Sequence, residues 1–247
     1  MKLTIVGSGD AFGSGGRLQT CYHVATSDGE LLIDCGATAL IGLDRLGLDP
    51  NRIGIILVSH LHGDHFAGLV WWMLHAVHVA KRTQPLLIVG PAGIEARYVA
   101  AAEALFPGAA STKRRFDVRF AEFRPEAPMT LGKVRVTPFE VCHPSGAPPY
   151  ALRIEADGRT LAFSGDTEWV DCLIRASAGA DLFLCECYGF DGTPRHHLSW
   201  RIIEQNLDRL TARRVLLTHM GTEMLANGLK VADPRVDLAK DGLRVVV

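Results

Sequence analysis

The chain carries a dense group of metal-binding residue types directly after a stretch that is apolar enough to be a buried strand. Residues 53–58, IGIILV, have the length and β-branched content of a strand in a sheet core. The next segment, residues 60–65, reads HLHGDH, so that three imidazoles and one carboxylate follow this strand within six residues. Imidazole and carboxylate are both good ligands for Zn²⁺. The sequence therefore predicts a metal site in a loop that a rigid sheet supports.

The spacing within this segment favours two metal ions over one. A tight turn cannot aim four side chains at a single tetrahedral ion. We expect His60 and His62 to face one ion and Asp64 and His65 to face the other. Gly63 is expected to let the backbone turn tightly between the two pairs.

Composition favours one globular domain that spans residues 1–247. Hydrophobic residues make up 48% of the chain and charged residues 21%, a balance that disordered chains lack. The net charge of −1 gives no general attraction to nucleic acid, and the only basic run, residues 113–115 with Arg119, is predicted to be a solvated loop.

The six cysteines form no Cys-x-x-Cys pair, and several lie inside apolar runs. Free cysteine behaves there as a small buried hydrophobe, so we expect a reduced protein of the cytoplasm. The longest mostly apolar stretch, residues 66–80, is shorter than the roughly 20 residues of a membrane span. We expect no membrane partner.

Strands and helices alternate in the first half of the chain, and the second half is richer in strands. Hydrophobic periodicity and turn residues predict strands at residues 3–6, 22–25, 31–36, 53–58, 86–91, 134–141, 150–156, 160–163, 181–187, 214–220 and 243–247. Helices are predicted at residues 38–46, 66–81, 93–106 and 196–210. This order indicates a layered α/β fold.

The glycine-rich segment 7–16 and the residue Asp34 need separate interpretations. The glycine-rich residues 7–16 lack the Gly-Lys-Ser/Thr ending of a phosphate-binding loop and precede no helical pattern, which excludes that type of nucleotide site. Asp34 ends an apolar run, where a carboxylate needs partners; it either holds a ligand imidazole or caps a turn.

Four predicted strands end in a metal-binding residue: His60, His143, Asp166 and His219. Ligands gather at strand ends in open α/β sheets, so we expect these residues to meet at one rim. One ion would take His60, His62 and His143, the other would take Asp64, His65 and His219, and Asp166 would bridge them.

Two Zn²⁺ ions about 3.5–4 Å apart activate a shared hydroxide and stabilise the attacking and leaving oxygens. Such a centre suits hydrolysis of a phosphodiester or a carbonyl compound, and Mn²⁺ or Fe would suit the same ligands.

The His-x-His-x-Asp-His segment at 60–65, with residues 164–167 (SGDT) and 217–219 (LTH), resembles the metallo-β-lactamase superfamily. This resemblance extends over nearly the whole chain and implies an αββα sandwich. The aspartate before the third histidine and the bridging aspartate are similar to those of the ribonuclease Z-like branch. That branch contains tRNA 3′-processing endonucleases, cyclic nucleotide phosphodiesterases and cyclic phosphate phosphodiesterases, so the resemblance implies phosphodiester hydrolysis.

The same resemblance implies a histidine near the start of the last helix that assists the leaving group. His197, two residues before Ser199, matches this element, and His196 is the neighbouring candidate. We take Asp64 and His197 as the catalytic residues.

Only 22 residues separate His143 from Asp166, so the long tRNA-gripping arm of ribonuclease Z is absent there. A small or cyclic phosphodiester is therefore favoured over nucleic acid as substrate. Trp71, Trp72 and Phe12 are candidates for stacking a base, for core packing or for contacts in a homodimer.

Other functions remain as alternatives. A carbonyl-ester hydrolase, either a lactonase or a thioesterase, and a tRNA 3′-processing endonuclease are compatible with the same ligands. Asp166 argues against a β-lactamase, in which cysteine is common at that position, and His62 argues against the iron-containing redox relatives, which carry glutamate there. His75 and His78 lie three apart, but without a nearby carboxylate we do not expect them to form a second site.

Overall fold

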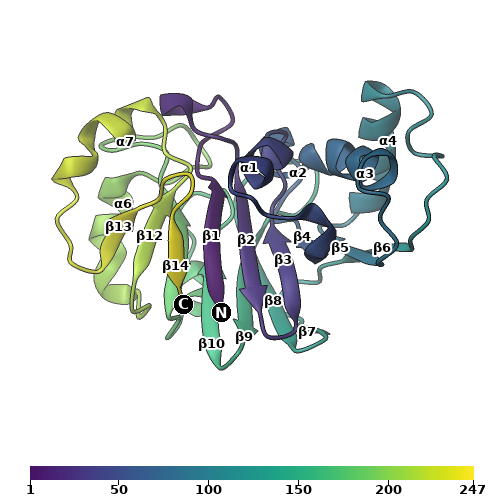
Figure 1. Ribbon diagram of the computed structural model, residues 1–247. Coiled ribbons are helices and arrows are strands. Elements are labelled where there is room, and N and C mark those ends of the chain that lie inside the picture. Colours follow the sequence, from purple (N-terminus) through teal and green to yellow (C-terminus); the bar gives the residue numbers. More distant parts are fainter.

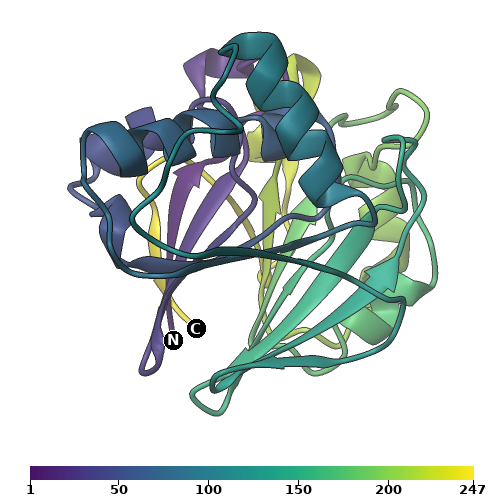
Figure 2. The same ribbon diagram turned by 90° about the vertical axis from the view of Figure 1, so that its right-hand side faces the viewer.

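Two seven-stranded sheets lie face to face, and helices cover the outer side of each sheet (Figure 2). The computed structural model describes residues 1–247. This arrangement is the expected αββα sandwich of the metallo-β-lactamase fold. None of the helices combines the length and the apolar character that crossing a bilayer requires.

The first sheet contains the N-terminal strands and the last strand of the chain. Its order is β14 (Arg244–Val246), β1 (Lys2–Gly7), β2 (Cys21–Thr26), β3 (Gly29–Ile33), β4 (Ile53–Leu57), β5 (Leu86–Gly90) and β6 (Val118–Glu122). β3 to β6 are parallel, whereas β14 pairs antiparallel with β1, which brings the two chain ends side by side (Figure 1).

The second sheet contains the remaining strands. Its order is β13 (Val236–Leu238), β12 (Val215–Thr218), β11 (Leu182–Glu186), β10 (Arg159–Phe163), β9 (Tyr150–Ala156), β8 (Val134–Glu140) and β7 (Met129–Leu131). β10 to β13 are parallel. β8 runs in the same direction as β10 because each pairs antiparallel with β9. The ends of β8, β10 and β12 therefore point to the same edge of the sheet.

The helices divide between the two outer faces (Figure 1). The first sheet is covered by α1 (Ala39–Arg45), α2 (Gly63–Phe66), α3 (Gly68–His78) and α4 (Ile94–Leu105). The second sheet is covered by α5 (Cys172–Ala176), α6 (Trp200–Asn206) and α7 (Thr222–Asn227). Four single-turn 3₁₀ helices lie at Ser14–Gly16, Pro50–Arg52, Leu207–Arg209 and Gly228–Lys230.

Three apolar layers fill the space between these elements. β10 shows why: Leu161 and Phe163 face the other sheet, whereas Ala162 between them faces the helices. Successive side chains of a strand point to opposite faces, so a strand buried on both faces must be apolar throughout. This requirement explains the continuous apolar runs that the sequence shows.

Each predicted strand and helix is present, with ends that shift by a few residues. The β9–β10 hairpin turns at Asp157 and Gly158, whose φ values of 54° and 68° suit a tight two-residue turn. The sequence patterns did not predict the short strands β6, β7 and β13 or the short helices α5 and α7. The three strands lie in the outer parts of the sheets and carry charged or exposed residues, so their hydrophobic patterns are weak.

Candidate metal centre

The four strand ends that the sequence singled out meet at one rim of the sandwich. His60 follows β4 of the first sheet, and His143, Asp166 and His219 follow β8, β10 and β12 of the second. A backbone hydrogen bond from Tyr150 N to Ser59 O, 3.0 Å long, joins the two sheets beside this rim.

The turn that follows β4 carries four of the seven expected ligands. His62 is extended, with φ −80° and ψ 151°, and Gly63 then begins the one-turn helix α2. Gly63 was expected to let the backbone turn tightly between the two ligand pairs, but it is helical, and a Cβ there would contact only the Cβ of Ala67, at 3.8 Å. The buried side chain of Leu61 anchors the turn in the core instead.

The first group of ligand atoms comes from His60, His62 and His143, whose ring nitrogens lie within 4.8 Å of one another. Nε2 of His143 is 2.9 Å from Nδ1 of His62. The ring of His143 is held from behind, because its Nδ1 lies 2.8 Å from the carbonyl oxygen of His196.

The second group comes from Asp64, His65, Asp166 and His219, all of them buried and again within 4.8 Å of one another. Nε2 of His65 and Nε2 of His219 each lie 3.2 Å from Oδ2 of Asp64. The backbone of His219 is left-handed, with φ 55°, a conformation that costs free energy for a residue other than glycine. Its N–H donates to the carbonyl oxygen of Ser8, at 3.0 Å.

One carboxylate oxygen lies between the two groups. Oδ2 of Asp166 is 3.8 Å from Nε2 of His60 and 4.0 Å from Nε2 of His143 in the first group. It is 3.2 Å from Nε2 of His65 and from Nε2 of His219 in the second. A carboxylate in this position could contact ions in both groups.

The protein alone leaves polar atoms of this centre without partners. Nε2 of His60, Nε2 of His65 and Oδ1 of Asp166 are buried and form no hydrogen bond. A buried polar group without a partner costs about 1–3 kcal/mol, so such groups are rare unless a ligand completes them. Nitrogen and carboxylate donors that converge in this way fit divalent cations.

The electrostatics of the two groups differ. Burial lowers the pKa of His143 to about 4 and that of His60 well below its usual range, which keeps these imidazoles neutral, the form that binds a metal. Burial also lowers the pKa of His219, but the charge of Asp166 and the hydrogen bond to Asp64 outweigh it and raise this pKa to about 9. The second group therefore attracts positive charge strongly.

Asp34 holds the second group from outside. Its Oδ2 accepts a hydrogen bond from Nδ1 of His65, at 2.6 Å, and its Oδ1 accepts one from the backbone N–H of Ser59, at 2.7 Å. Both of the roles considered for Asp34 are thus present, because it orients an imidazole and also fixes the turn after β4. Such outer contacts set the tautomer and the direction of a ligand ring.

Glu186, at the end of β11, was not predicted from the sequence as a residue of the site. Glu186 is completely buried, and its Oε1 lies 3.1 Å from Nδ1 of His197 and accepts a hydrogen bond from the backbone N–H of Thr167, at 2.6 Å. Burial lowers the pKa of His197, but the carboxylate outweighs burial and raises it. A charged residue within the apolar run 182–187 was the available signal.

His197 and His196 occupy different positions. The ring of His197 stacks at 5.6 Å on that of His219 and lies 4.9 Å from that of His143, so it borders both groups of ligand atoms. The ring of Tyr188 lies 5.1 Å from that of His197 and 6.3 Å from that of His219. The side chain of His196 instead lies near Cys142 and Glu168.

The remaining candidates contribute no ligand atom to the centre. Trp72 is buried in the core beneath the guanidinium of Arg82, and Trp71 packs edge-on against Phe106, so the structure favours core packing over base stacking for both residues. Phe12 is 83% exposed. His75 and His78 do not belong to any group of metal-binding side chains.

A comparison with protein families gives a match over almost the whole chain. The profile described as "Anti-Pycsar protein Apyc1" matches residues 1–242. The chain belongs to this family. Among the relatives of this Apyc1-family protein, Mycobacterium tuberculosis Rv1339 is 31% identical over 229 residues, which cover 89% of the present chain and 81% of the relative.

Curated relatives named metallo-hydrolase and ribonuclease Z support the predicted ribonuclease Z-like branch of the metallo-β-lactamase superfamily. The probable metallo-hydrolase YhfI of Bacillus subtilis is 25% identical over 251 residues, covering 98% of each chain, and its crystal structure matches with a TM-score of 0.79 over 99% of each chain. The structure of human tRNase Z, short form, matches with a TM-score of 0.81 at 22% identity, over 100% of this chain and 99% of that one. The Apyc1-family protein is therefore a metal-dependent hydrolase, as predicted.

Proposed function

We propose that this protein is a dinuclear metal-dependent phosphodiesterase that acts on a small or cyclic phosphodiester. The observation that carries the proposal is the position of Asp166 Oδ2, within 4.0 Å of imidazole nitrogens from both groups of ligand atoms. One carboxylate oxygen that lies between two sets of ligands suits a pair of neighbouring ions.

In this proposal His60, His62 and His143 would hold the first ion, Asp64, His65 and His219 would hold the second, and Asp166 would contact both. We propose Zn²⁺ for both positions, because the ligands are imidazoles and carboxylates. When bound, such a pair of ions would supply an activated water and stabilise the negative charge that develops on a phosphate.

The protein's own contribution to phosphodiester cleavage would come from His197 and Asp64. His197, hydrogen-bonded to Glu186, has a raised pKa and borders the centre, so it is suited to give a proton to the departing oxygen. Nearby positive charge gives Asp64, next to His65 and His219, a pKa well below its usual range despite its burial. Asp64 would therefore remain ionised and orient the attacking water.

The size of the substrate is inferred from the segment between His143 and Asp166. This segment forms the short β9–β10 hairpin, which turns at Asp157 and Gly158 and adds no extension. With a net charge of −1, the chain also lacks the excess of basic residues that favours binding to a long polyanion. A small diester needs neither feature. Human tRNase Z, whose name denotes a nuclease for tRNA, supports the bond class and not the substrate.

A panel of substrates tests the proposal with the metal-loaded enzyme. We expect hydrolysis of bis-p-nitrophenyl phosphate and of cyclic nucleotides, but no turnover of a lactone, a thioester, nitrocefin or a precursor tRNA. His197→Ala should slow diester turnover about 10²–10⁴-fold while its metal content stays that of the wild type. Turnover of the lactone or thioester alone would replace the proposal with a carbonyl-ester hydrolase, and cleavage of the precursor tRNA alone would replace it with an endonuclease.

A further inference from the structure

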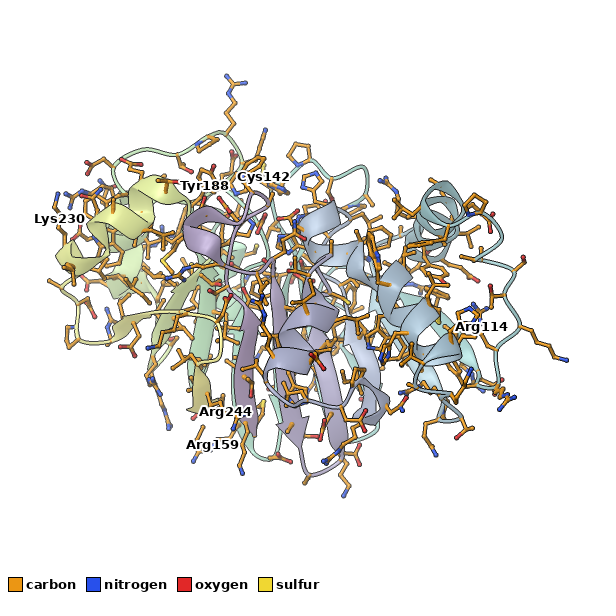
Figure 3. All side chains as sticks on the ribbon, turned by 45° about the horizontal axis from the view of Figure 1, so that its top comes forward. Arg114, Cys142, Arg159, Tyr188, Lys230 and Arg244 are labelled. Carbon is orange, nitrogen blue, oxygen red and sulfur yellow. The ribbon has the colours of Figure 1, made fainter.

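A third group of metal-binding side chains lies outside the centre described above. Cys142 follows β8, Glu168 follows β10, and His196 precedes α6, and their ligand atoms lie within 4.8 Å of one another. Cys142 is at the same end of the molecule as Tyr188, far from Arg159 and Arg244 at the opposite end (Figure 3). None of the three side chains belongs to the seven proposed ligands.

These three side chains approach one another around a single ring nitrogen of His196. Sγ of Cys142 is 3.8 Å and Oε2 of Glu168 is 3.5 Å from the same ring nitrogen, Nδ1 of His196. A single imidazole nitrogen either donates or accepts one hydrogen bond, so it cannot satisfy a thiol and a carboxylate together. In a catalytic triad, by contrast, the base and the carboxylate use different nitrogens of the ring.

The distances agree with those of a tetrahedral zinc site. Bond lengths of about 2.3 Å to sulfur and about 2.0 Å to nitrogen or oxygen give tetrahedron edges of about 3.6 Å for sulfur to nitrogen and about 3.3 Å for nitrogen to oxygen. The observed separations of 3.8 and 3.5 Å exceed these edges by only a few tenths of an ångström.

The backbone holds the group together without a metal. The N–H of Glu168 donates to the carbonyl oxygen of Cys142, at 3.2 Å, and the N–H of Cys142 donates to Oγ1 of Thr167, at 3.1 Å. His196 has a left-handed φ of 68°, which directs its carbonyl oxygen to the ring of His143. The side chains of His196 and Glu168 are 35% and 47% exposed, so an ion can reach them from solvent.

We propose that Cys142, Glu168 and His196 form a separate third metal site that takes one Zn²⁺ or a similar thiophilic divalent ion, with water in the fourth position. Binding releases the thiol proton of Cys142 to solvent, because the thiolate is the ligand form. An occupied site fastens the segment that carries His143 to the segment that carries His197. It is therefore placed to stabilise the rim of the catalytic centre.

Metal analysis of the full chain tests the third site independently of any enzymatic activity. After dialysis against excess Zn²⁺, we expect the wild type to hold one equivalent more than Cys142→Ser. Cys172→Ser is the matched control, because Cys172 is also half-buried but belongs to no group of metal-binding side chains, and it should keep the wild-type content.

Cobalt supplies a second readout. The seven proposed ligands contain no sulfur, so a thiolate-to-cobalt charge-transfer band in the near ultraviolet should arise only from the third site. We expect this band in the wild type and in Cys172→Ser and its loss in Cys142→Ser.

Two further variants retain the thiol of Cys142 and test whether a loss of metal in Cys142→Ser is caused by misfolding. Glu168→Gln preserves side-chain shape, and His196→Asn suits the left-handed backbone, since asparagine tolerates a positive φ. Both should bind one equivalent less than the wild type. Equal metal content in the wild type and all three site variants, or a cobalt band that persists in Cys142→Ser, would overturn the proposal.

Discussion

Nδ1 of His197 lies 3.1 Å from Oε1 of Glu186, a carboxylate that is completely buried at the end of β11. This contact orients the ring of His197 beside the metal centre, and the carboxylate raises the pKa of that ring against the opposing effect of burial. His197 and Glu186 lie only 11 residues apart in the chain, yet no local pattern in the sequence predicts that they contact each other.

The Glu186–His197 pair gives the first prediction. Glu186→Gln keeps the size of the side chain but removes its charge, so it should reduce turnover of a diester about 10- to 100-fold, as is typical for partners that orient functional groups. Metal content should stay unchanged. Equal rates in Glu186→Gln and the wild type would show that the pair has no part in turnover.

A second prediction concerns Asp34. Asp34→Asn should weaken metal binding about 10- to 100-fold, because Nδ1 of His65 loses a carboxylate acceptor 2.6 Å away. Chelator competition would measure this affinity. Asp49→Asn is the control, since Asp49 only caps a 3₁₀ turn and lies outside the metal-binding groups. An unchanged affinity in Asp34→Asn would contradict the role of Asp34 in orienting the ligand.

Gly36 and Gly54 allow a matched pair of substitutions. A Cβ on Gly36 would collide with the carbonyl oxygen of Asp64, whereas one on Gly54 would meet nothing within 4 Å. Gly36→Ala should therefore cost about 1–3 kcal/mol of unfolding free energy and displace the metal-binding turn. Gly54→Ala should be neutral or stabilising by up to about 1 kcal/mol. Chemical denaturation would compare them, and equal stabilities would refute the close packing at Gly36.

Removal of metal should destabilise the protein. Without cations, Nε2 of His60, Nε2 of His65 and Oδ1 of Asp166 are buried without partners. Metal at a hundred times its Kd contributes about 2.7 kcal/mol to the folded state, so a chelator should lower Tm measurably. The same treatment should have a smaller effect on Asp166→Ala. A Tm that does not respond to the chelator in the wild type would argue against bound metal.

Asp157 provides a test of pH dependence away from the metal centre. Hydrogen bonds from the hydroxyl and backbone N–H of Ser27 hold the pKa of Asp157 below its usual value of 3.8. The ionised carboxylate of Asp157 therefore adds to the unfolding free energy above pH 4, and this contribution is lost as the pH falls through the lowered pKa. Asp157→Asn should be about 0.2–1 kcal/mol less stable at pH 7, and this difference should disappear in acid. Asparagine tolerates the φ of 54°, so the variant isolates the charge. Denaturation at several pH values would measure the difference, and a constant difference would contradict this origin.

Local sequence patterns were sufficient for most of the fold. The apolar runs gave the central strands because a strand buried on both faces must be apolar throughout. Turn residues such as Asp157-Gly158 gave the hairpin, since few residues adopt positive φ. The outer strands β6, β7 and β13 could not be predicted, because charged and exposed residues interrupt their periodicity and pairing with a neighbour decides whether they form.

The sequence by itself determined which residues are candidates for the metal centre, because the chemistry of the HLHGDH segment and of the polar strand ends is local. Only the tertiary structure decided that Asp166 Oδ2 lies between two groups of imidazoles, that Glu186 holds His197, and that Cys142, Glu168 and His196 share a point in space. Those relationships join residues from different strands and from both sheets. Their distances depend on how the two sheets pack, which no short stretch of sequence encodes.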